Sequence, residues 1–242
     1  MKVAIIQARM GSSRLPGKVL KEINGKPMLW HLINRVKLAK GLDEIVLAIP
    51  NTKENDKLEE LAKELKIKCI RGSEKDVLSR YILAGKNTGA DIIVMITGDC
   101  PLVCPEIIDE TLKEFKERKC DYLFNDQKYS NFPRGFDVDI FYFEAIKKAD
   151  KLAKDQKYRE HSALFMAEHP EMFKTEVFMA KGNLARPGYR LCVDEEKDFE
   201  LANKIFRHFA PREDFTAEEI IIFLDKNPKT AEINKNVSQK KY

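Results

Sequence analysis

The chain has 242 residues, of which 43% are hydrophobic and 34% are charged, a composition that supports a core of ordinary size and excludes a disordered chain. No apolar run approaches the roughly 20 residues that span a bilayer, and the apolar start is too short for a signal peptide. Five scattered cysteines, an odd number, argue against a disulfide scaffold. We expect a cytoplasmic protein with no membrane partner: one domain over residues 1–226 and a polar tail over residues 227–242.

The net charge of +4 is spread unevenly along the chain. The first 40 residues carry nine basic groups and one acid, which gives +8, and residues 226–242 carry +4, so the stretch between them sums to −8. A basic chain can bind nucleic acid, but most of this chain is acidic, and we expect no nucleic-acid partner. The basic N-terminal end indicates an anion-binding pocket, with a solvated basic surface as the alternative.

Short apolar stretches alternate with helical patterns through the first half. We predict strands over 3–7, 44–49, 67–70, 91–96 and 121–124, and helices over 27–39, 54–65, 75–87 and 105–118. This alternation implies right-handed crossovers and a mostly parallel α/β sheet with helices on both faces. Such sheets bind ligands beyond the carboxyl ends of their strands, which points to the loops after Gln7, Ile70, Ile96 and Phe124.

The regular alternation breaks after residue 125. There the patterns predict strands over 136–143, 176–179 and 189–193, and helices over 144–154, 158–168, 195–208 and 217–224. Residues 227–242 are polar, and we expect them to fray.

The loop after the first predicted strand has the composition of a phosphate-binding loop. Its glycines expose backbone N–H donors, its serines add hydroxyl donors, and Arg9, Arg14 and Lys18 neutralise charge. It is not an ATPase P-loop, because five residues rather than four separate Gly11 from Gly17, and it has no third glycine for a dinucleotide fingerprint. A flexible basic surface loop is the alternative.

Several spaced motifs together closely resemble the acylneuraminate and ketodeoxyoctonate cytidylyltransferases, the CMP-sugar synthetases, most of all their spore-coat polysaccharide branch. The motifs are residues 8–18, Arg71-Gly72-Ser73 to Arg80-Tyr81, Gly98-Asp99-Cys100-Pro101-Leu102, Phe132-Pro133-Arg134-Gly135 to Asp139, Arg159-Glu160-His161, and Arg190 to Asp194. The resemblance implies a Rossmann-like, GT-A-like nucleotidyltransferase fold with a small α+β extension. Residues 125–168 would form the acceptor-sugar and dimerisation region of a homodimer.

The resemblance also implies a reaction and its residues. CMP would pass from CTP to the anomeric hydroxyl of an acidic 2-keto-3-deoxy sugar, a nonulosonic or octulosonic acid, for cell-surface polysaccharide. Arg9, Lys18 and Asp99 would be catalytic. The nucleotide-binding residues would be Ala8, Arg9, Gly11, Ser12, Arg14, Lys18, Arg71, Gly72 and Ser73.

Asp99 directly follows the apolar fourth strand, at the carboxyl edge of the sheet and facing the first loop. It could instead cap the helix that Pro105 begins. Triphosphate chemistry needs Mg²⁺, which prefers hard oxygen ligands. The resemblance assigns the metal to Asp99 and Asp194, although Cys192 and Glu196 stand where threonine and proline are common. The other acids beside Asp194 fit an acidic cluster at a helix N-terminus; they are Glu195, Glu196 and Asp198.

Asp137 and Asp139 fall on one face of a predicted strand. Their spacing is that of the metal-binding Asp-x-Asp of glycosyltransferases, whereas the resemblance favours recognition of sugar hydroxyls. The sugar carboxylate would bind cations among Arg134, Arg159, His161 and Arg190, each of which also fits an ordinary surface ion pair. Two other functions stay open: a glycosyltransferase that binds a nucleotide sugar through the two aspartates, and a non-catalytic nucleotide- or RNA-binding module.

Overall fold

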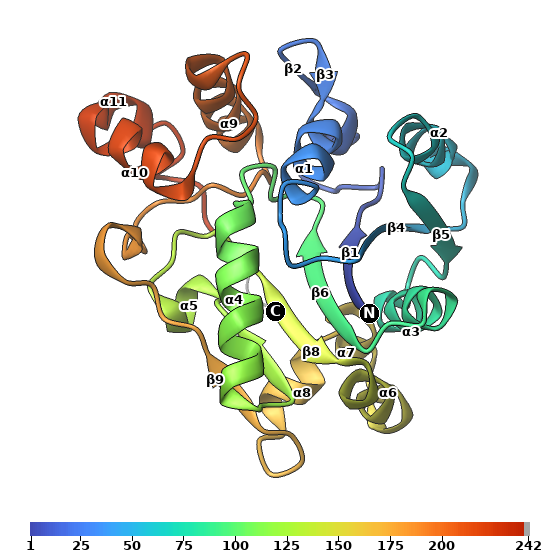
Figure 1. The fold of residues 1–242 in the computed structure, drawn as a ribbon. Coiled ribbons are helices and arrows are strands. Elements are labelled where there is room, and N and C mark those ends of the chain that lie inside the picture. The colour runs from blue at the N-terminus through green and yellow to red at the C-terminus, as the bar shows by residue number, and fades with distance from the viewer. Residues whose placement is uncertain (240–242) are drawn as a thin grey trace.

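The computed structural model describes residues 1–239 and is built around a seven-stranded sheet (Figure 1). The strands of this sheet are β1 (Lys2–Gln7), β4 (Glu44–Pro50), β5 (Lys68–Gly72), β6 (Ile92–Thr97), β7 (Tyr122–Phe124), β8 (Asp139–Tyr142) and β9 (Thr175–Val177). Their order across the sheet is β5-β4-β1-β6-β8-β7-β9. A separate two-stranded sheet joins β2 (Glu22–Ile23) to β3 (Lys26–Pro27).

Most strands of the large sheet run in one direction. Strands β5, β4, β1 and β6 pair in parallel, with Ile5 opposite both Val46 and Met95. Strand β8 is antiparallel to both β6 and β7, and β9 pairs in parallel with β7. The start of β8 therefore lies at the same edge as the carboxyl ends of the other strands. The prediction of a mostly parallel sheet is confirmed.

Helices cover both faces of the sheet. The α-helices are α1 (Met28–Val36), α2 (Asp56–Glu64), α3 (Val77–Thr88), α4 (Pro105–Arg118), α5 (Gln127–Ser130), α6 (Phe143–Leu152), α7 (Gln156–Glu160), α8 (Leu164–Glu168), α9 (Glu196–Phe209), α10 (Ala217–Lys226) and α11 (Pro228–Ala231). Three short 3₁₀ turns are η1 (Lys18–Leu20), η2 (Lys53–Asn55) and η3 (Gly182–Leu184). Helices α1, α2, α4, α9 and α10 bury their apolar sides in one core, and α3, α6 and α8 bury theirs in another. Over residues 1–239, no helix is long and apolar enough to cross a membrane.

Local signals explain where several helices begin and end. Asp76 accepts a hydrogen bond from the Ser79 amide at 2.9 Å and so caps α3, which ends at Gly89 in the left-handed conformation. Pro105 occupies the first position of α4, where its missing N–H costs nothing. Thr216 and Glu219 form a reciprocal capping box at the start of α10. The four helices predicted in the first half all begin within two residues of their predicted starts.

Two elements predicted in the second half differ from the structure: one predicted strand is absent, and one predicted helix is divided in two. Residues 189–193 do not form a strand. Only an isolated bridge joins Arg190 to Arg134, where the Leu191 amide donates to the Arg134 carbonyl at 2.6 Å, and the Val193 amide then donates to the Asp99 carbonyl at 2.7 Å. The predicted helix over 158–168 is broken into α7 and α8. The break lies at His161, whose φ of −106° and ψ of 80° leave the helical region.

Two further predictions need correction. The strand over 136–143 begins later, at Asp139, because Asp137 belongs to the preceding turn and accepts from the Gly135 amide at 2.6 Å. The tail does not fray over its described part: Pro228–Ala231 is helical and Asn234 is buried. Residues 240–242 of that prediction lie outside the described residues. Asn234 and Gln239 both contact Arg190, so this described segment packs back onto the body of the protein.

Candidate active site

The carboxyl ends of β1 and β6 meet at Gly98, and this contact sets the position of the site. The Gly98 amide donates to the Gln7 carbonyl oxygen at 2.7 Å. A Cβ atom at residue 98 would lie 2.7 Å from that oxygen and 2.9 Å from the Ala8 Cβ, so any side chain here would push the two strands apart. Asp99 therefore follows at the sheet edge beside the first loop, as predicted.

The first loop folds back on itself. The Met10 carbonyl oxygen accepts from the amides of Ser12, at 2.8 Å, and Gly17, at 3.0 Å. The Met10 amide donates to the Oδ1 atom of Asn55, a fully buried side chain, at 2.9 Å. Gly17 has a φ of +68°, a conformation that favours glycine. The loop is therefore held by hydrogen bonds within itself and by Asn55 of η2.

Four of the predicted nucleotide contacts lie on this loop at different depths. Ala8 is buried against β4, where its amide donates to a carbonyl oxygen, and Ser12 is partly buried, with its Oγ atom accepting from the Leu15 amide at 3.4 Å. Arg9 and Gly11 are exposed. Arg9 forms no ion pair within residues 1–239, so the loop offers its guanidinium and exposed backbone to solvent at the edge of the sheet.

Lys18 lies at the centre of the site although it is only 8% exposed. Its ammonium donates to the Val193 carbonyl at 2.6 Å and to Asp194 Oδ1 at 3.0 Å, and lies 3.5 Å from Asp99 Oδ2. Burial alone would lower the pKa of Lys18, but the charges of Asp99 and Asp194 outweigh it and raise the pKa above its ordinary value. Lys18 therefore stays charged and joins the two predicted metal ligands.

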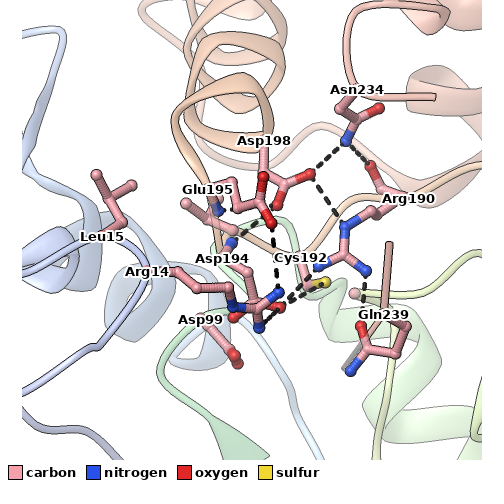
Figure 2. A network of polar contacts seen from close by, with 12 residues as sticks. Arg14, Leu15, Asp99, Arg190, Cys192, Asp194, Glu195, Asp198, Asn234 and Gln239 are labelled. Carbon is pink, nitrogen blue, oxygen red and sulfur yellow. Dashed lines mark hydrogen bonds and ion pairs between the residues drawn. The ribbon is translucent and has the colours of Figure 1, made fainter. Parts of the chain in front are cut away.

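Asp194 is surrounded by cations (Figure 2). Besides Lys18, its carboxylate binds Arg14 at 2.8 Å and Arg190 at 2.7 Å, both through Oδ2. Burial alone would raise the pKa of Asp194, but Lys18, Arg14 and Arg190 hold it below its usual value. Arg14 also approaches Glu195 at 3.8 Å. The arrangement fixes Arg14, a residue of the basic loop, above the sheet edge.

Asp198 anchors the other side of this network, and its side chain is fully buried. It binds Arg190 Nε at 3.0 Å and Asn234 Nδ2 at 2.7 Å, and it accepts from the Glu195 amide at 3.0 Å, which caps α9. Gln239 accepts from Arg190 Nη1 at 2.7 Å (Figure 2). The acids beside Asp194 therefore act at the start of a helix, and the C-terminal segment helps to hold Arg190.

Asp137 and Asp139 lie at the same sheet edge, on the β8 side. Asp137 Oδ2 accepts from the Gly135 amide, and Asp139 Oδ1 accepts from the Tyr122 hydroxyl at 3.1 Å. Burial raises the pKa of Asp137 to about 6, against the attraction of Arg134, and burial together with the Asp137 charge raises the pKa of Asp139 to about 8. These carboxyls are held in an environment that disfavours their charge.

The Pro-Arg-Gly turn packs directly on the segment that carries Asp194. The Arg134 amide donates to the Tyr189 carbonyl at 3.1 Å. Gly135 has a φ of +105°, and a Cβ there would lie 2.5 Å from the Cys192 amide nitrogen. The Arg134 guanidinium lies 3.7 Å from Asp126. The turn thus brings Arg134 between the acceptor-side aspartates and the Asp194 network.

Two predicted sugar-binding residues are placed elsewhere in the fold. Arg159 binds Asp76 at 2.6 Å and Asp150 at 2.8 Å, so it ties α7 to α3 and α6 as an ion pair, the alternative that the sequence left open. His161 lies at the break between α7 and α8, and burial lowers its pKa. The ion-pair partners of Arg159 thus lie on α6 and at the start of α3 rather than in the Asp194 network.

The Arg71 side chain also faces away from the basic loop. Its guanidinium binds Asp56 at 2.8 Å and Glu59 at 2.7 Å, both on α2. Gly72 ends β5, and a Cβ there would lie 2.9 Å from Arg80 Cγ, while the Ser73 carbonyl accepts from Arg80. This segment can therefore present its backbone to a ligand, whereas the Arg71 charge is already neutralised.

The two predicted metal ligands converge on one point. Asp99 and Asp194 both approach the Lys18 ammonium, so a cation bound between them would meet two hard oxygen donors. Mg²⁺ is commonly held by one or two carboxylates together with phosphate oxygens and water. Over the described residues, no group of three or more His, Cys, Asp or Glu side chains is arranged to hold a metal. The pair therefore fits Mg²⁺ provided that the substrate supplies further ligands.

Some residues of the site escaped the sequence analysis. Asn55 and Asn234 are buried polar side chains that hold the basic loop and the Asp198 network. Tyr81 is fully buried, and its hydroxyl has no hydrogen-bond partner in the described structure. No local pattern marks the two asparagines, but Tyr81 stands in a motif that the sequence had already singled out.

Comparisons with known proteins identify the family. The family model for cytidylyltransferases matches residues 3–227. The chain is 31% identical to the spore coat polysaccharide biosynthesis protein SpsF of Bacillus subtilis over 232 residues, which cover 94% of this chain and 95% of that protein. It is 38% identical to the 8-amino-3,8-dideoxy-manno-octulosonate cytidylyltransferase of Shewanella frigidimarina over 125 residues, 50% of this chain and 51% of that one.

A solved structure supports the same assignment. A cytidylyltransferase from Leptospira borgpetersenii serovar Hardjo-bovis is similar with a TM-score of 0.90 and 31% identity, and the match covers 100% of this chain and 98% of that chain. The fold is the Rossmann-like nucleotidyltransferase fold that the motifs implied. The family model and the similarity over nearly the whole chain agree with the basic loop and Asp99 at the sheet edge. The chain therefore belongs to the cytidylyltransferase family and is a CTP-dependent nucleotidyltransferase.

Proposed function

We propose that the protein transfers CMP from CTP to the anomeric hydroxyl of an acidic 2-keto-3-deoxy sugar. The sugar oxygen forms a bond to the α-phosphorus, the bond from that phosphorus to the β-phosphate oxygen breaks, and pyrophosphate leaves. The hydroxyl proton passes to solvent water. The observation that carries the proposal is the Lys18 ammonium, buried between Asp99 and Asp194 at the edge where the basic loop begins.

The basic loop would bind the triphosphate. Arg14 and Lys18 are already held in place by Asp194, so their positive charges need little reorganisation when charge develops on the leaving pyrophosphate. Arg9 is exposed and free to approach the phosphates. Exposed backbone at Gly11 and the Ser12 hydroxyl add hydrogen-bond donors, and the backbone of residues 71–73 would contact the nucleotide.

Mg²⁺ would be held by Asp99 and Asp194, together with phosphate oxygens of CTP. When bound, it would neutralise phosphate charge. The protein itself would position the two carboxylates. The hydrogen bond from the Gly98 amide to Gln7 fixes the backbone before Asp99, and the ion pair with Arg190 holds the Asp194 side chain.

The sugar class rests on the relatives. The Shewanella relative is named for an acidic octulosonate, and the Bacillus relative is named for polysaccharide biosynthesis. Arg134, whose charge acts on Asp137, would bind the sugar carboxylate. A homodimer formed through residues 125–168 and a cytoplasmic location stay predictions.

Release of pyrophosphate tests the proposal. The protein should release pyrophosphate from CTP, in preference to the other three nucleoside triphosphates, when one of a panel of acidic 2-keto-3-deoxy sugars is present. A chelator should abolish the release, and added Mg²⁺ should restore it. If every acidic sugar fails while CTP alone is turned over, the acceptor class is wrong.

A matched pair of variants tests the site. Asp99→Asn removes the charge at the carboxyl end of β6, and we expect turnover to fall by at least about 100-fold. Asp91→Asn removes a charge just before the other end of the same strand, where Asp91 pairs with the N-terminal amine, and turnover should stay near the parent rate. Equal effects of the two changes would contradict the assignment.

A further inference from the structure

The C-terminal segment, residues 228–239, completes the network around Asp194. It lies beyond residues 3–227, over which the family model matches. The segment begins with the short helix α11, which packs against α9 and α10, and Ile233 packs against the main core. This packing leaves Asn234 buried and Gln239 partly buried, both beside the Arg190 guanidinium (Figure 2). The segment therefore brings two side-chain amides into a network of charged groups.

Asn234 joins Asp198 to the backbone of Arg190. Its Nδ2 atom donates to Asp198 Oδ1 at 2.7 Å and to the Arg190 carbonyl oxygen at 2.9 Å, so both of its hydrogens have acceptors. Asp198 Oδ1 also accepts from Arg190 Nε at 3.0 Å. The other oxygen of Asp198 accepts from the amides of Asp194 and Glu195, each at 3.0 Å. Asn234 therefore completes the donors around a buried carboxylate that holds the backbone at Asp194.

Each nitrogen of the Arg190 guanidinium has a partner. Nε donates to Asp198, Nη1 donates to Gln239 Oε1 at 2.7 Å, and Nη2 donates to Asp194 Oδ2 at 2.7 Å. Because the guanidinium is planar and rigid, fixing Nε and Nη1 also fixes the direction of Nη2. The contacts of Arg190 with Asp198 and Gln239 therefore determine where it holds the Asp194 carboxylate.

The orientation of the Asp194 carboxylate bears on metal binding. Its Oδ2 atom is bound by Arg190 at 2.7 Å and by Arg14 at 2.8 Å. Its Oδ1 atom lies 3.0 Å from the Lys18 ammonium, which in turn lies 3.5 Å from Asp99. A cation bound between Asp99 and Asp194 would therefore meet Oδ1. Replacing a residue that orients a metal ligand typically lowers metal affinity or activity by about 10- to 100-fold.

We propose that Asn234 and Gln239 are positioning residues for the reaction. They hold Arg190, and Arg190 holds Asp194 so that Oδ1 points to the place of the metal ion. This inference rests on the proposed function and adds two residues that act on its metal site from outside it. The C-terminal segment thus sets how strongly Mg²⁺ supports the binding of CTP.

A role in stability alone is the competing explanation. Asp198 is fully buried, so loss of the Asn234 amide leaves a carboxylate oxygen with one donor fewer and destabilises the fold. Gln239 is different, because it is partly exposed and its described hydrogen bond is the one that it accepts from Arg190. The two residues therefore differ in their expected effect on stability, whereas positioning predicts that both affect the metal.

The coupling between Mg²⁺ and CTP measures positioning without turnover. Calorimetry in the absence of any sugar gives the dissociation constant of CTP with and without Mg²⁺, and the ratio of the two constants is this coupling. In the parent protein Mg²⁺ should tighten CTP binding by more than about tenfold. Asn234→Ala should reduce the ratio by about tenfold. Gln239→Ala removes one hydrogen bond and should reduce it by about threefold.

Two control variants locate the effect at Arg190. Asn227→Ala removes the same type of side chain just before α11, where the Asn227 amide is exposed and donates to the Phe223 carbonyl at 2.7 Å, so the ratio should stay at the parent value. Gln239→Glu keeps an acceptor for Arg190 Nη1, and its ratio should be no lower than that of the parent. Melting temperatures of all variants show that each is folded during the titration.

The outcomes separate this inference from the proposed function. A parent ratio in Asn234→Ala and Gln239→Ala, whatever their melting temperatures, overturns positioning and leaves CMP transfer intact. Equal losses in Gln239→Ala and Gln239→Glu also overturn it, because the Arg190 contact would then not matter. If Asn234→Ala fails to fold, the two Gln239 variants decide the question. Failure of every acidic sugar to release pyrophosphate overturns the proposed function, while the CTP titrations, which need no acceptor, still report on Asn234 and Gln239.

Discussion

Two groups of carboxylates lie at one edge of the sheet in opposite electrostatic settings. Asp194 is bound by Lys18, Arg14 and Arg190, and its pKa is held below the usual value. Asp139 forms no ion pair within residues 1–239, and burial raises its pKa to about 8. Both residues are aspartates. Their pKa values differ because cationic side chains surround Asp194, whereas burial dominates around Asp139.

This contrast shows how the site divides its work between protein and substrate. Around Asp194 the protein has already paired its charges, so the cations that would meet the triphosphate are fixed before it binds, which favours catalysis by preorganised charge. Around Asp137 and Asp139 the described residues form no ion pair with either carboxyl, and burial raises the pKa of both. The two sides of the site therefore differ in how completely the protein itself pairs their charges.

The strongest test of the Asp194 side is removal of its shared ammonium. Lys18→Ala removes the ammonium that joins Asp99 to Asp194, while Arg14 and Arg190 still bind Asp194, and it removes a charge from the triphosphate site. We expect kcat to fall by about 100- to 1000-fold, measured as pyrophosphate release under saturating CTP. Lys21→Ala is the matched control, because Lys21 binds the exposed Glu196 at 2.5 Å and should barely change kcat.

A second test separates the structural part of that network. Arg190→Met leaves Asp198 fully buried without its guanidinium, and breaking a buried pair costs about 3 kcal/mol of unfolding free energy. Chemical denaturation should show this loss. The control is Arg186→Met, which breaks an exposed pair with Asp225 and should cost less than about 1 kcal/mol. Similar losses in both variants would show that the Asp194 network carries little stability.

The Asp139 side can be tested by the pH dependence of stability. The folded pKa of Asp139, about 8, lies above its unfolded value, so its stability contribution is complete below the unfolded pKa and is lost as pH rises toward 8. Asp139→Asn removes this loss. The melting temperature of the variant should therefore match the parent at about pH 4 and exceed it at pH 8.5, by about 2–4 °C for each kcal/mol gained.

The pH test has a clear contrary result. A parent protein that gains stability over the variant between pH 5 and pH 8 would show that the Asp139 carboxylate has a cationic partner in solution. Asp43→Asn is a useful comparison, because the hydrogen bond from the Lys2 amide and the Lys2 charge hold the pKa of Asp43 below its usual value, and that variant should lose stability at neutral pH.

The sequence predicted the sheet well because its core strands carry strong local signals. Strand β6 is an almost wholly apolar run, and Pro105 and Gly89 mark helix ends through backbone constraints that act locally. The strand predicted over residues 189–193 is wrong, although apolar residues alternate there as they do in a strand. Their backbone partners, Arg134 and Asp99, lie far away in the chain, so no local pattern reveals that they never join a sheet.

The site was predictable where a residue's role depends on its own loop or strand. Lys18 and Asp99 follow from the motif and from the carboxyl-edge rule, and the structure brings them within 3.5 Å. Arg159 depends instead on Asp76 and Asp150, two acids from other helices, which settle its charge before any sugar arrives. Orphaned atoms such as the Tyr81 hydroxyl are defined by what is absent around them, so they emerge from three-dimensional packing alone.

The smallest expected effect comes from an arginine whose charge is already satisfied. Arg71→Ala breaks half-exposed pairs with Asp56 and Glu59, worth about 0–1 kcal/mol, and leaves the backbone of residues 71–73 in place. KM for CTP should therefore change by less than about threefold. Arg9→Ala, at an exposed guanidinium on the basic loop, should raise it more. A large rise for Arg71→Ala would mean that its guanidinium leaves α2 to bind the nucleotide, and the cation-rich region would then extend from Asp194 across to β5.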